Sequence, residues 1–161
     1  MEEVVLDLLK SRDLRLGVVE SATGGLISHL LTNIPGSSDC YKGGITAYAN
    51  EIKVNAVAVS TVLLERHGAV SSEVAQEMAA GGKRALGVDI CLSDTGIAGP
   101  GGATPEKPVG LFYLGLAHGD LVLSRKFIFT GSRAEIKTAA AETGLAWLRE
   151  YLAGLQNDRL A

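Results

Sequence analysis

The spacing of apolar positions predicts alternating helices and strands along the whole chain. Apolar residues recur at helical spacing over 2–11, whereas the largely apolar run over 14–19 is typical of a buried strand. A helix is expected over 23–32, ended by Asn33 and Pro35. By the same criteria, further strands are predicted over 43–49, 88–93, 109–117 and 121–129. Further helices are expected to begin at Asn50, at Ser60, at Ser71 or Ser72, and at Ser132.

This order of elements predicts a three-layer α/β/α sandwich, with helices on both faces of one sheet. The dipeptide Gly119-Asp120 separates the last two predicted strands and favours a hairpin, so the sheet should be mixed and mostly parallel. The chain has 161 residues and no internal repeat or linker, which predicts a single domain over 1–161. Its core is expected within about 4–152, and residues 156–161 are expected to be a frayed tail.

Composition narrows the class of protein. Hydrophobic residues make up 47% of the chain, charged residues 20%, and the formal net charge is −3, as in ordinary soluble proteins. The absence of a long basic run argues against nucleic-acid binding. No apolar run could cross a bilayer, and Met1-Glu2-Glu3 does not resemble a signal peptide, so a cytoplasmic location without membrane association is predicted.

Neither the cysteines nor the histidines suggest a metal site. Cys40 and Cys91 are far apart and lack the spacing of zinc ligands, so both are interpreted as reduced thiols. His29, His67 and His118 belong to no metal motif or catalytic triad order. The prediction is therefore a protein without metal or other cofactor.

A serine lies on the turn between the first predicted strand and the following helix. Ser21 stands beside Gly24 and Gly25, next to the N–H groups of a new helix, where a nucleophile could be presented and an anion stabilised. Serine is also a common cap or filler in such turns. The turn alone therefore leaves a catalytic and a structural interpretation open.

A lysine near the end of the next predicted strand could activate that serine. Lys53 follows Tyr48 on a short helix, near the edge of the sheet where sites in α/β proteins gather. A lysine can act as a base if desolvation or nearby positive charge lowers its pKa. Most lysines on short helices are solvated, so the pairing with Ser21 is a hypothesis for the structure to test.

Two further features could bind an anion. The loop over 96–102 contains four glycines after a predicted strand, and its N–H groups could approach a ligand closely. It matches neither the P-loop nor the dinucleotide fingerprint, and it could be a flexible connection. Arg133 lies in the first turn of the last helix, where a cation opposes the helix dipole unless an anion binds there. It is a candidate phosphate ligand or a solvated side chain.

Seven segments in a fixed order closely resemble the CinA C-terminal domain family, the nicotinamide mononucleotide (NMN) deamidases. They are Glu20-Ser21-Ala22-Thr23-Gly24-Gly25, Pro35-Gly36-Ser37-Ser38, Tyr48-Ala49-Asn50-Glu51-Ile52-Lys53, His67-Gly68-Ala69-Val70-Ser71, Gly96-Ile97-Ala98-Gly99-Pro100-Gly101-Gly102, Lys107-Pro108-Val109-Gly110 and Gly131-Ser132-Arg133. The resemblance covers roughly residues 4–152.

The resemblance implies hydrolysis of the NMN carboxamide to nicotinic acid mononucleotide and ammonia by a serine–lysine mechanism. Ser21 would be the nucleophile and Lys53 its base, with Tyr48 as a third catalytic residue. The expected substrate-binding residues are Thr23, Gly24, Gly25, Ser38, Gly99, Gly101, Gly102 and Arg133. Should Ser21 not be the nucleophile, Ser38 is the next hydroxyl to consider.

Two positions depart from the family pattern. Ala22 stands where the family usually has cysteine, a change between small side chains. Asp94 stands where the family usually has a small or apolar residue. A carboxylate at this position would disturb the charge balance of the substrate if it faced the pocket.

The sequence is also compatible with two other functions. One is a non-catalytic nucleotide-binding or regulatory domain that retains the pocket, and the other is an amidohydrolase for another pyridine nucleotide or small amide. A homodimer or higher homo-oligomer is also expected, from the high aliphatic content, the mean hydropathy of +0.22 and the resemblance.

Overall fold

A five-stranded sheet forms the centre of the computed structural model, which describes residues 1–155. The predicted tail over 156–161 lies outside the described residues. The strand order is β2-β1-β3-β4-β5. The strands are β1 (Leu16–Glu20), β2 (Tyr41–Thr46), β3 (Ile90–Gly96), β4 (Leu111–His118) and β5 (Leu121–Ile128).

The sheet is mixed, with four of its five strands running in one direction. β1 pairs in parallel with β2 and with β3. β4 pairs antiparallel with both β3 and β5, so β4 alone runs in the opposite direction. The hairpin predicted at Gly119-Asp120 joins β4 to β5. These pairings confirm the predicted mixed, mostly parallel sheet.

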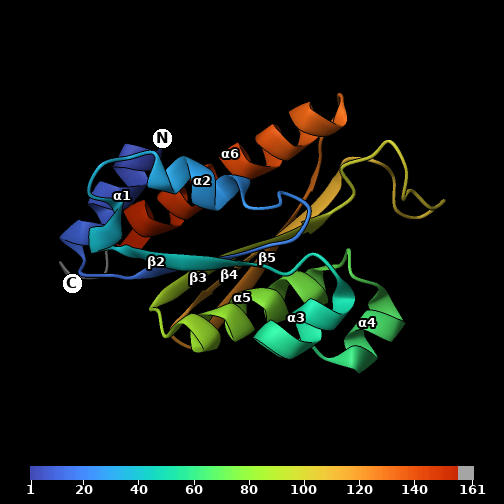
Figure 1. Ribbon diagram of the computed structural model, residues 1–161, viewed down its shortest axis with the longest axis horizontal. Coiled ribbons are helices and arrows are strands. Elements are labelled where there is room, and N and C mark those ends of the chain that lie inside the picture. Colours follow the sequence, from blue (N-terminus) through green and yellow to red (C-terminus); the bar gives the residue numbers. More distant parts are fainter. Residues whose placement is uncertain (156–161) are drawn as a thin grey trace.

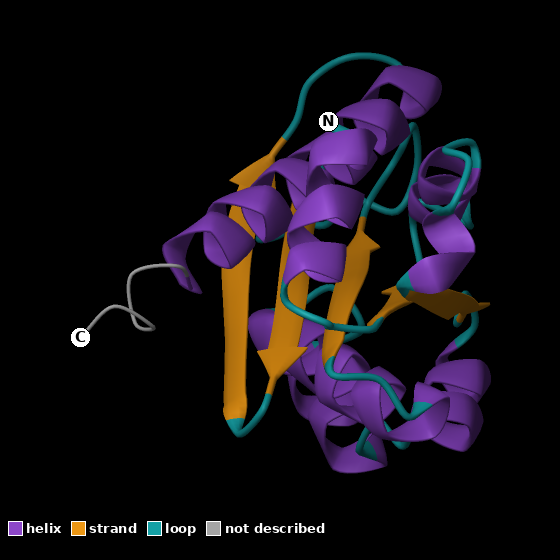
Figure 2. Cartoon of the chain, turned by 90° about the vertical axis from the view of Figure 1, so that its left-hand side faces the viewer, coloured by secondary structure: helices purple, strands orange, loops and turns teal. Residues whose placement is uncertain are grey.

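Helices cover both faces of the sheet (Figure 1). One layer contains α1 (Glu2–Ser11), α2 (Leu26–Thr32) and α6 (Arg133–Gly154), and the other contains α3 (Asn50–Val57), α4 (Thr61–His67) and α5 (Ser72–Leu86). Turning the molecule by 90° shows the strands with α6 crossing in front of them (Figure 2). The three-layer α/β/α architecture predicted from the sequence is confirmed.

The central strands are buried on both sides because helices cover both faces. All five residues of β1 are buried, and only Gly96 of the seven in β3 is partly exposed. α6 buries an apolar face that includes Leu145 and Leu148, and its N-terminus carries the predicted capping box of Ser132 and Glu135. Within residues 1–155, no helix is long and apolar enough to cross a membrane.

Several elements begin or end at residues other than those predicted. α2 begins at Leu26 instead of residue 23, because Gly24 and Gly25 adopt positive φ angles of 64° and 99° that a helix cannot contain. β2 ends at Thr46, before Tyr48. β3 continues through Asp94 to Gly96, so the polar residues at its end belong to the buried sheet.

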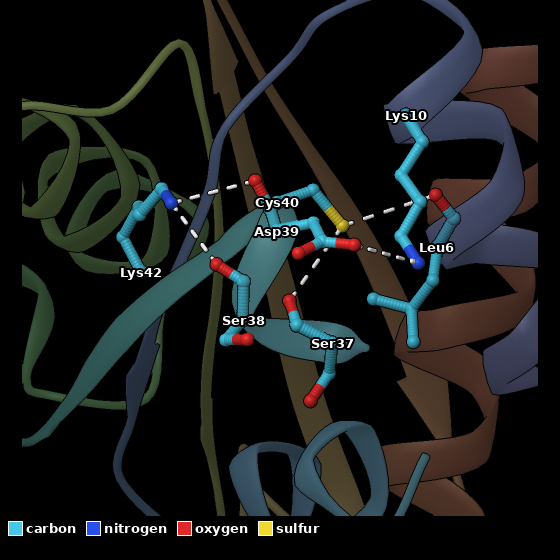
Figure 3. A network of polar contacts seen from close by, with 7 residues as sticks. All are labelled: Leu6, Lys10, Ser37, Ser38, Asp39, Cys40 and Lys42. Carbon is cyan, nitrogen blue, oxygen red and sulfur yellow. Dashed lines mark hydrogen bonds and ion pairs between the residues drawn. The ribbon is translucent and has the colours of Figure 1, made fainter. Parts of the chain in front are cut away.

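A short 3₁₀ helix, η1 (Ser37–Asp39), leads into the beginning of β2. Figure 3 shows the contacts that hold it: the Cys40 thiol lies 3.8 Å from the backbone oxygens of Leu6 and Ser37. Lys10 forms an ion pair of 3.4 Å with Asp39. These contacts join η1 to α1. They lie where β2 begins, whereas Thr46 is at the other end of that strand.

Candidate active site

The ends of three parallel strands bring the predicted site residues to one edge of the sheet. β1 ends at Glu20, β2 at Thr46 and β3 at Gly96. The segments that follow them carry the motifs identified in the sequence, and the carboxyl ends of parallel strands are the usual location of sites in α/β folds. The strand order therefore places the Ser21 turn between the segment leading to α3 and the glycine-rich loop.

The side chains of Ser21 and Lys53 are in contact at this edge of the sheet. The Lys53 Nζ donates a hydrogen bond of 3.0 Å to the Ser21 Oγ. Lys53 is only 1% exposed and Ser21 is 7% exposed. Burial lowers the pKa of the Lys53 ammonium, and the charge of Asp94 partly opposes this change. The amine is thus desolvated in the way that favours a neutral base.

Two backbone carbonyls fix the orientation of the amine. Lys53 Nζ donates hydrogen bonds of 2.8 Å to the oxygens of Ala47 and Tyr48. Carbonyl oxygens can only accept, so these bonds use two N–H groups of the amine. When Lys53 is neutral, its lone pair is left for the Ser21 hydroxyl. The geometry therefore allows the lysine to accept the proton of the serine.

A cavity of about 240 Å³ opens beside this pair. Its lining includes five of the residues predicted from the sequence besides the pair itself: Tyr48, Gly99, Gly101, Gly102 and Arg133. No aspartate or glutamate of the described residues lines it. When Lys53 is neutral, Arg133 is the charged side chain in the lining, which favours an anionic ligand.

Arg133 holds the glycine-rich loop at the mouth of the cavity. Its guanidinium donates a hydrogen bond of 2.7 Å to the Gly99 oxygen and lies 3.5 Å from the Tyr48 hydroxyl. Tyr48 is 64% exposed, and only its backbone oxygen contacts Lys53. The structure therefore places Tyr48 beside the site, while its predicted catalytic role stays a prediction.

The N-terminus of α2 is already occupied by an anion of the protein itself. Glu20 is 1% exposed, and its carboxylate accepts hydrogen bonds from the backbone N–H groups of Gly25, Ile27 and Ser28. The Ser28 hydroxyl donates a fourth, of 2.7 Å. The expectation that these helix N–H groups stabilise a bound anion is therefore wrong, because Glu20 uses them.

Three more predicted substrate-binding residues do not line the cavity. Thr23 is 1% exposed and its hydroxyl contacts buried carboxyl groups. Gly24 and Gly25 form the turn before α2, where the Gly24 N–H donates to the backbone oxygen of Ser21. Their polar groups bond to Asp94, to Glu20 and to the Ser21 backbone oxygen, so their role as substrate ligands stays a prediction.

Ser38 is not brought to the cavity of its own chain. It is exposed in η1, which precedes β2, whereas the cavity lies beyond the other end of that strand. The prediction that Ser38 lies in or near the site is therefore wrong for the single chain. Its backbone oxygen accepts a hydrogen bond of 3.0 Å from Lys42 (Figure 3).

Asp94 does not face the cavity. Its side chain is 0% exposed and accepts hydrogen bonds from the N–H groups of Ser21 and Thr23, at 3.2 and 3.1 Å. Burial raises the pKa of this carboxyl group to about 6. Asp94 thus holds the turn that carries Ser21 through these two hydrogen bonds. Because it does not line the cavity, it does not place a negative charge there.

Several lining residues were not predicted from the sequence. They are Ala22, Asn50, Ala69, Val70 and Thr95, whereas Gly96, Ile97 and Ala98 belong to the loop that the sequence indicated as a possible anion site. Thr95 could have been suspected as a polar residue at a strand end, but it donates to the Ala69 oxygen. The Ala22 N–H has no hydrogen-bond partner within the described chain, which makes it available to a ligand.

The part of the chain that the structure describes contains no group of three or more His, Cys, Asp and Glu residues placed to hold a metal ion. The histidines lie away from the cavity. His118 contacts the Tyr151 hydroxyl at 2.9 Å, and His67 lies 3.9 Å from Glu73. The reactive groups inside the site are therefore a serine and a lysine.

Fold and site together define a class: α/β proteins with a buried serine–lysine pair at the carboxyl ends of parallel strands. The family model of the CinA C-terminal domain matches residues 1–152. The chain belongs to this family.

The similar proteins agree with this assignment. A CinA-like protein of Thermotoga maritima is 47% identical over 154 residues, which are 96% of this chain and 38% of that protein. A CinA-like protein of Dictyoglomus thermophilum is 46% identical over 155 residues, with the same two shares. The chain thus spans less than two fifths of the length of these curated relatives.

Solved structures have the same fold. The competence damage-inducible protein A (ComA) of Klebsiella pneumoniae superposes with a TM-score of 0.92 at 30% identity, covering 94% of each chain. The competence/damage inducible protein CihA of Agrobacterium tumefaciens gives a TM-score of 0.89 at 36% identity, again covering 94% of each chain.

Proposed function

We propose that this chain is an amidohydrolase that converts NMN to nicotinic acid mononucleotide and ammonia. The observation that carries the proposal is the buried contact between Lys53 Nζ and Ser21 Oγ, with the amine held by two carbonyl oxygens. Membership of the CinA family is compatible with it. A desolvated lysine beside a serine is one of the arrangements that activate a hydroxyl nucleophile.

In the first half of the reaction, neutral Lys53 accepts the Ser21 proton as Oγ attacks the carboxamide carbon. The resulting tetrahedral intermediate collapses when the lysine gives its proton to the leaving nitrogen, which departs as ammonia. An ester then joins Ser21 to the nicotinoyl group. In the second half, Lys53 takes a proton from water, the hydroxide attacks the ester, and the serine recovers its proton. The carboxylic acid formed in this step releases its proton to solvent, which leaves the free carboxylate.

The Ala22 N–H is the best-placed donor for the negative oxygen of the intermediate. The N–H groups of the glycine turn, which the sequence suggested for this role, already have partners. The Gly24 N–H donates to the Ser21 backbone oxygen, and the Gly25 N–H donates to the Glu20 carboxylate. Ala22 lines the cavity and follows the nucleophile directly. A donor at that position stabilises the oxyanion in other serine hydrolases.

The charge of the cavity suits the phosphate of a nucleotide. Arg133 lines the cavity and forms no ion pair with a carboxylate among residues 1–155. It also lines an adjoining hollow that contains Lys137. These two cations lie four residues apart on α6, so they share one face of the helix. We propose that the phosphate of NMN binds at Arg133, with Lys137 adding to the positive potential.

Ammonia release from NMN, nicotinamide and NAD, measured side by side, tests the proposed function. Release from NMN alone is expected, and Ser21→Ala protein should release none above background. Treatment with a chelator should leave the rate unchanged, because the proposed reaction uses no metal. Nucleotide binding without ammonia release would favour the alternative of a non-catalytic nucleotide-binding domain.

A further inference from the structure

The buried side chains of Glu20, Thr23 and Asp94 are linked by hydrogen bonds next to the turn that carries Ser21. The Thr23 hydroxyl oxygen lies 2.6 Å from Glu20 Oε2 and 2.5 Å from Asp94 Oδ2. The exposed fractions are 1% for Glu20, 1% for Thr23 and 0% for Asp94. The proposed reaction uses none of these side chains directly.

The geometry of these three side chains determines how many protons their two hydrogen bonds require. A threonine hydroxyl carries one proton, so it can donate to only one of the two carboxyl groups. The other contact is a hydrogen bond only if that carboxyl group is protonated and donates to the hydroxyl oxygen. Without the extra proton, two oxygen atoms bearing lone pairs would face each other in a buried space, which is unfavourable.

The other hydrogen bonds indicate which carboxyl group carries the proton. Glu20 accepts from three backbone N–H groups and from the Ser28 hydroxyl, and four such donors stabilise its ionised form. Asp94 accepts from only two N–H groups, those of Ser21 and Thr23. The proton is therefore better placed on Asp94, which donates to Thr23, while Thr23 donates to Glu20.

We propose that Asp94 is a positioning residue whose carboxyl group holds the shared proton of the Glu20–Thr23–Asp94 chain. It fixes the turn on both sides of Ala22 by accepting the N–H groups of Ser21 and Thr23. Its importance for catalysis rests on the proposed function, whereas its protonation does not. Glu20 and Lys53 are the charged groups that face Asp94 from the elements packed against it.

The protonation of Asp94 also affects Lys53. Ionisation of Asp94 places a negative charge near the lysine and raises the pKa of Lys53. While Asp94 keeps its proton, this effect is absent and the amine loses its own proton more readily. The pH at which Lys53 becomes a base therefore depends on whether Asp94 is ionised.

Infrared spectroscopy of the intact protein tests the shared proton without any substrate. At pH 5.5, where an ordinary aspartate with a pKa of about 3.9 is almost fully ionised, a protonated-carboxyl band is expected. The band should shift on incorporation of carboxyl-¹³C aspartate, disappear in Asp94→Asn, and persist in Asp120→Asn, a control at the exposed β4–β5 turn. A missing band in the unsubstituted protein, or a band insensitive to labelled aspartate, would overturn the proposal.

A second measurement follows the reactivity of Ser21 through its rate of labelling by a fluorophosphonate. The rate should rise with pH. Above about pH 6, where Asp94 loses its proton, its charge opposes deprotonation of Lys53, so the midpoint should move to lower pH in the uncharged Asp94→Asn variant. Asp94→Ala should lower the plateau rate by about tenfold or more through loss of two hydrogen bonds to the turn. A midpoint moved to higher pH in Asp94→Asn, or an unchanged plateau in Asp94→Ala, would contradict the assignment. Failure of NMN turnover affects neither measurement.

Discussion

At the residue scale, the proposed chemistry depends on the contact between Lys53 Nζ and Ser21 Oγ. The two carbonyl bonds of Lys53 orient the amine toward the hydroxyl, and the hydroxyl has the amine as its hydrogen-bond partner. Groups arranged in this way act as one catalytic unit.

Removal of either member of the pair should therefore abolish most of the activity. Ser21→Ala and Lys53→Ala are each expected to lower kcat for NMN by about a thousandfold or more, and the double variant should be little worse than either. Steady-state kinetics with circular dichroism as a check on folding provides the measurement. Lys42→Ala, an exposed lysine at the far end of β2, is the matched control and should keep its activity. Multiplicative losses in the double variant would disprove a shared unit.

The pH dependence of kcat/KM should report the state of Lys53. The base acts when it is deprotonated, so the rate should rise with pH through the lysine pKa and then level off. Burial lowers that pKa, so the rise should be centred below the ordinary lysine value of about 10.4. Enzyme stability must be checked across the same range. A rise centred at or above the ordinary value would argue against Lys53 as the base.

Arg133→Ala should weaken the binding of NMN more than it slows the chemistry. Loss of a charge-assisted contact to phosphate costs about 1.5–3 kcal/mol, which corresponds to a KM raised by about tenfold or more. Lys126→Ala, an exposed cation on β5, is the control for a change of net charge. If KM changes equally in both variants, or in neither, the proposed phosphate contact is wrong.

At the element scale, the position of α3 depends on its close approach to α5. A Cβ atom at Gly81 would overlap the backbone oxygen of Val57, at the end of the helix that carries Lys53. Any larger residue at this position must push the end of α3 away from α5. The packing of two helices therefore controls the distance between base and nucleophile.

Gly81→Ala is expected to reduce both stability and activity. Overpacking of this kind costs about 1–3 kcal/mol in the free energy of unfolding, and displacement of α3 should lower kcat. Gly154→Ala is the matched control, because a Cβ at that helical position meets nothing within 4 Å. Urea unfolding and NMN turnover of the two variants make the comparison. Equal stability of both would refute the role assigned to this contact.

The sequence predicted the elements well because its apolar periodicity reflects burial on both faces of the sheet. It also located Ser21 and Lys53, since each follows a strand whose end lies at the same edge. The Glu20–Thr23–Asp94 chain was not predicted, because Asp94 is 71 residues from Thr23 and their contact exists only after β1 and β3 pair.

Residues assigned by motif alone were less reliable. Ser38 lies in a motif close to the others in sequence, but β2 separates it from the cavity in space. The turn glycines are required for their positive φ angles, which the sequence cannot distinguish from a ligand-binding role. The motif residues that follow the end of a parallel strand lie at the site, whereas Ser38, which precedes β2, does not.

At the scale of the whole molecule, we predict a homodimer or higher homo-oligomer. The support is the high aliphatic content and the mean hydropathy of +0.22, together with the prevalence of closed two-fold assemblies. Light scattering coupled to size-exclusion chromatography at micromolar concentration measures the mass directly. A mass of one chain would refute the assembly without affecting the serine–lysine chemistry.

The most direct test of the central claim is ammonia release from NMN by the purified protein beside its Ser21→Ala variant. The account predicts stoichiometric formation of ammonia and nicotinic acid mononucleotide by the unsubstituted protein, and none above background by the variant. It would be contradicted by a folded protein that binds NMN without releasing ammonia, or by a Ser21→Ala variant that retains substantial turnover.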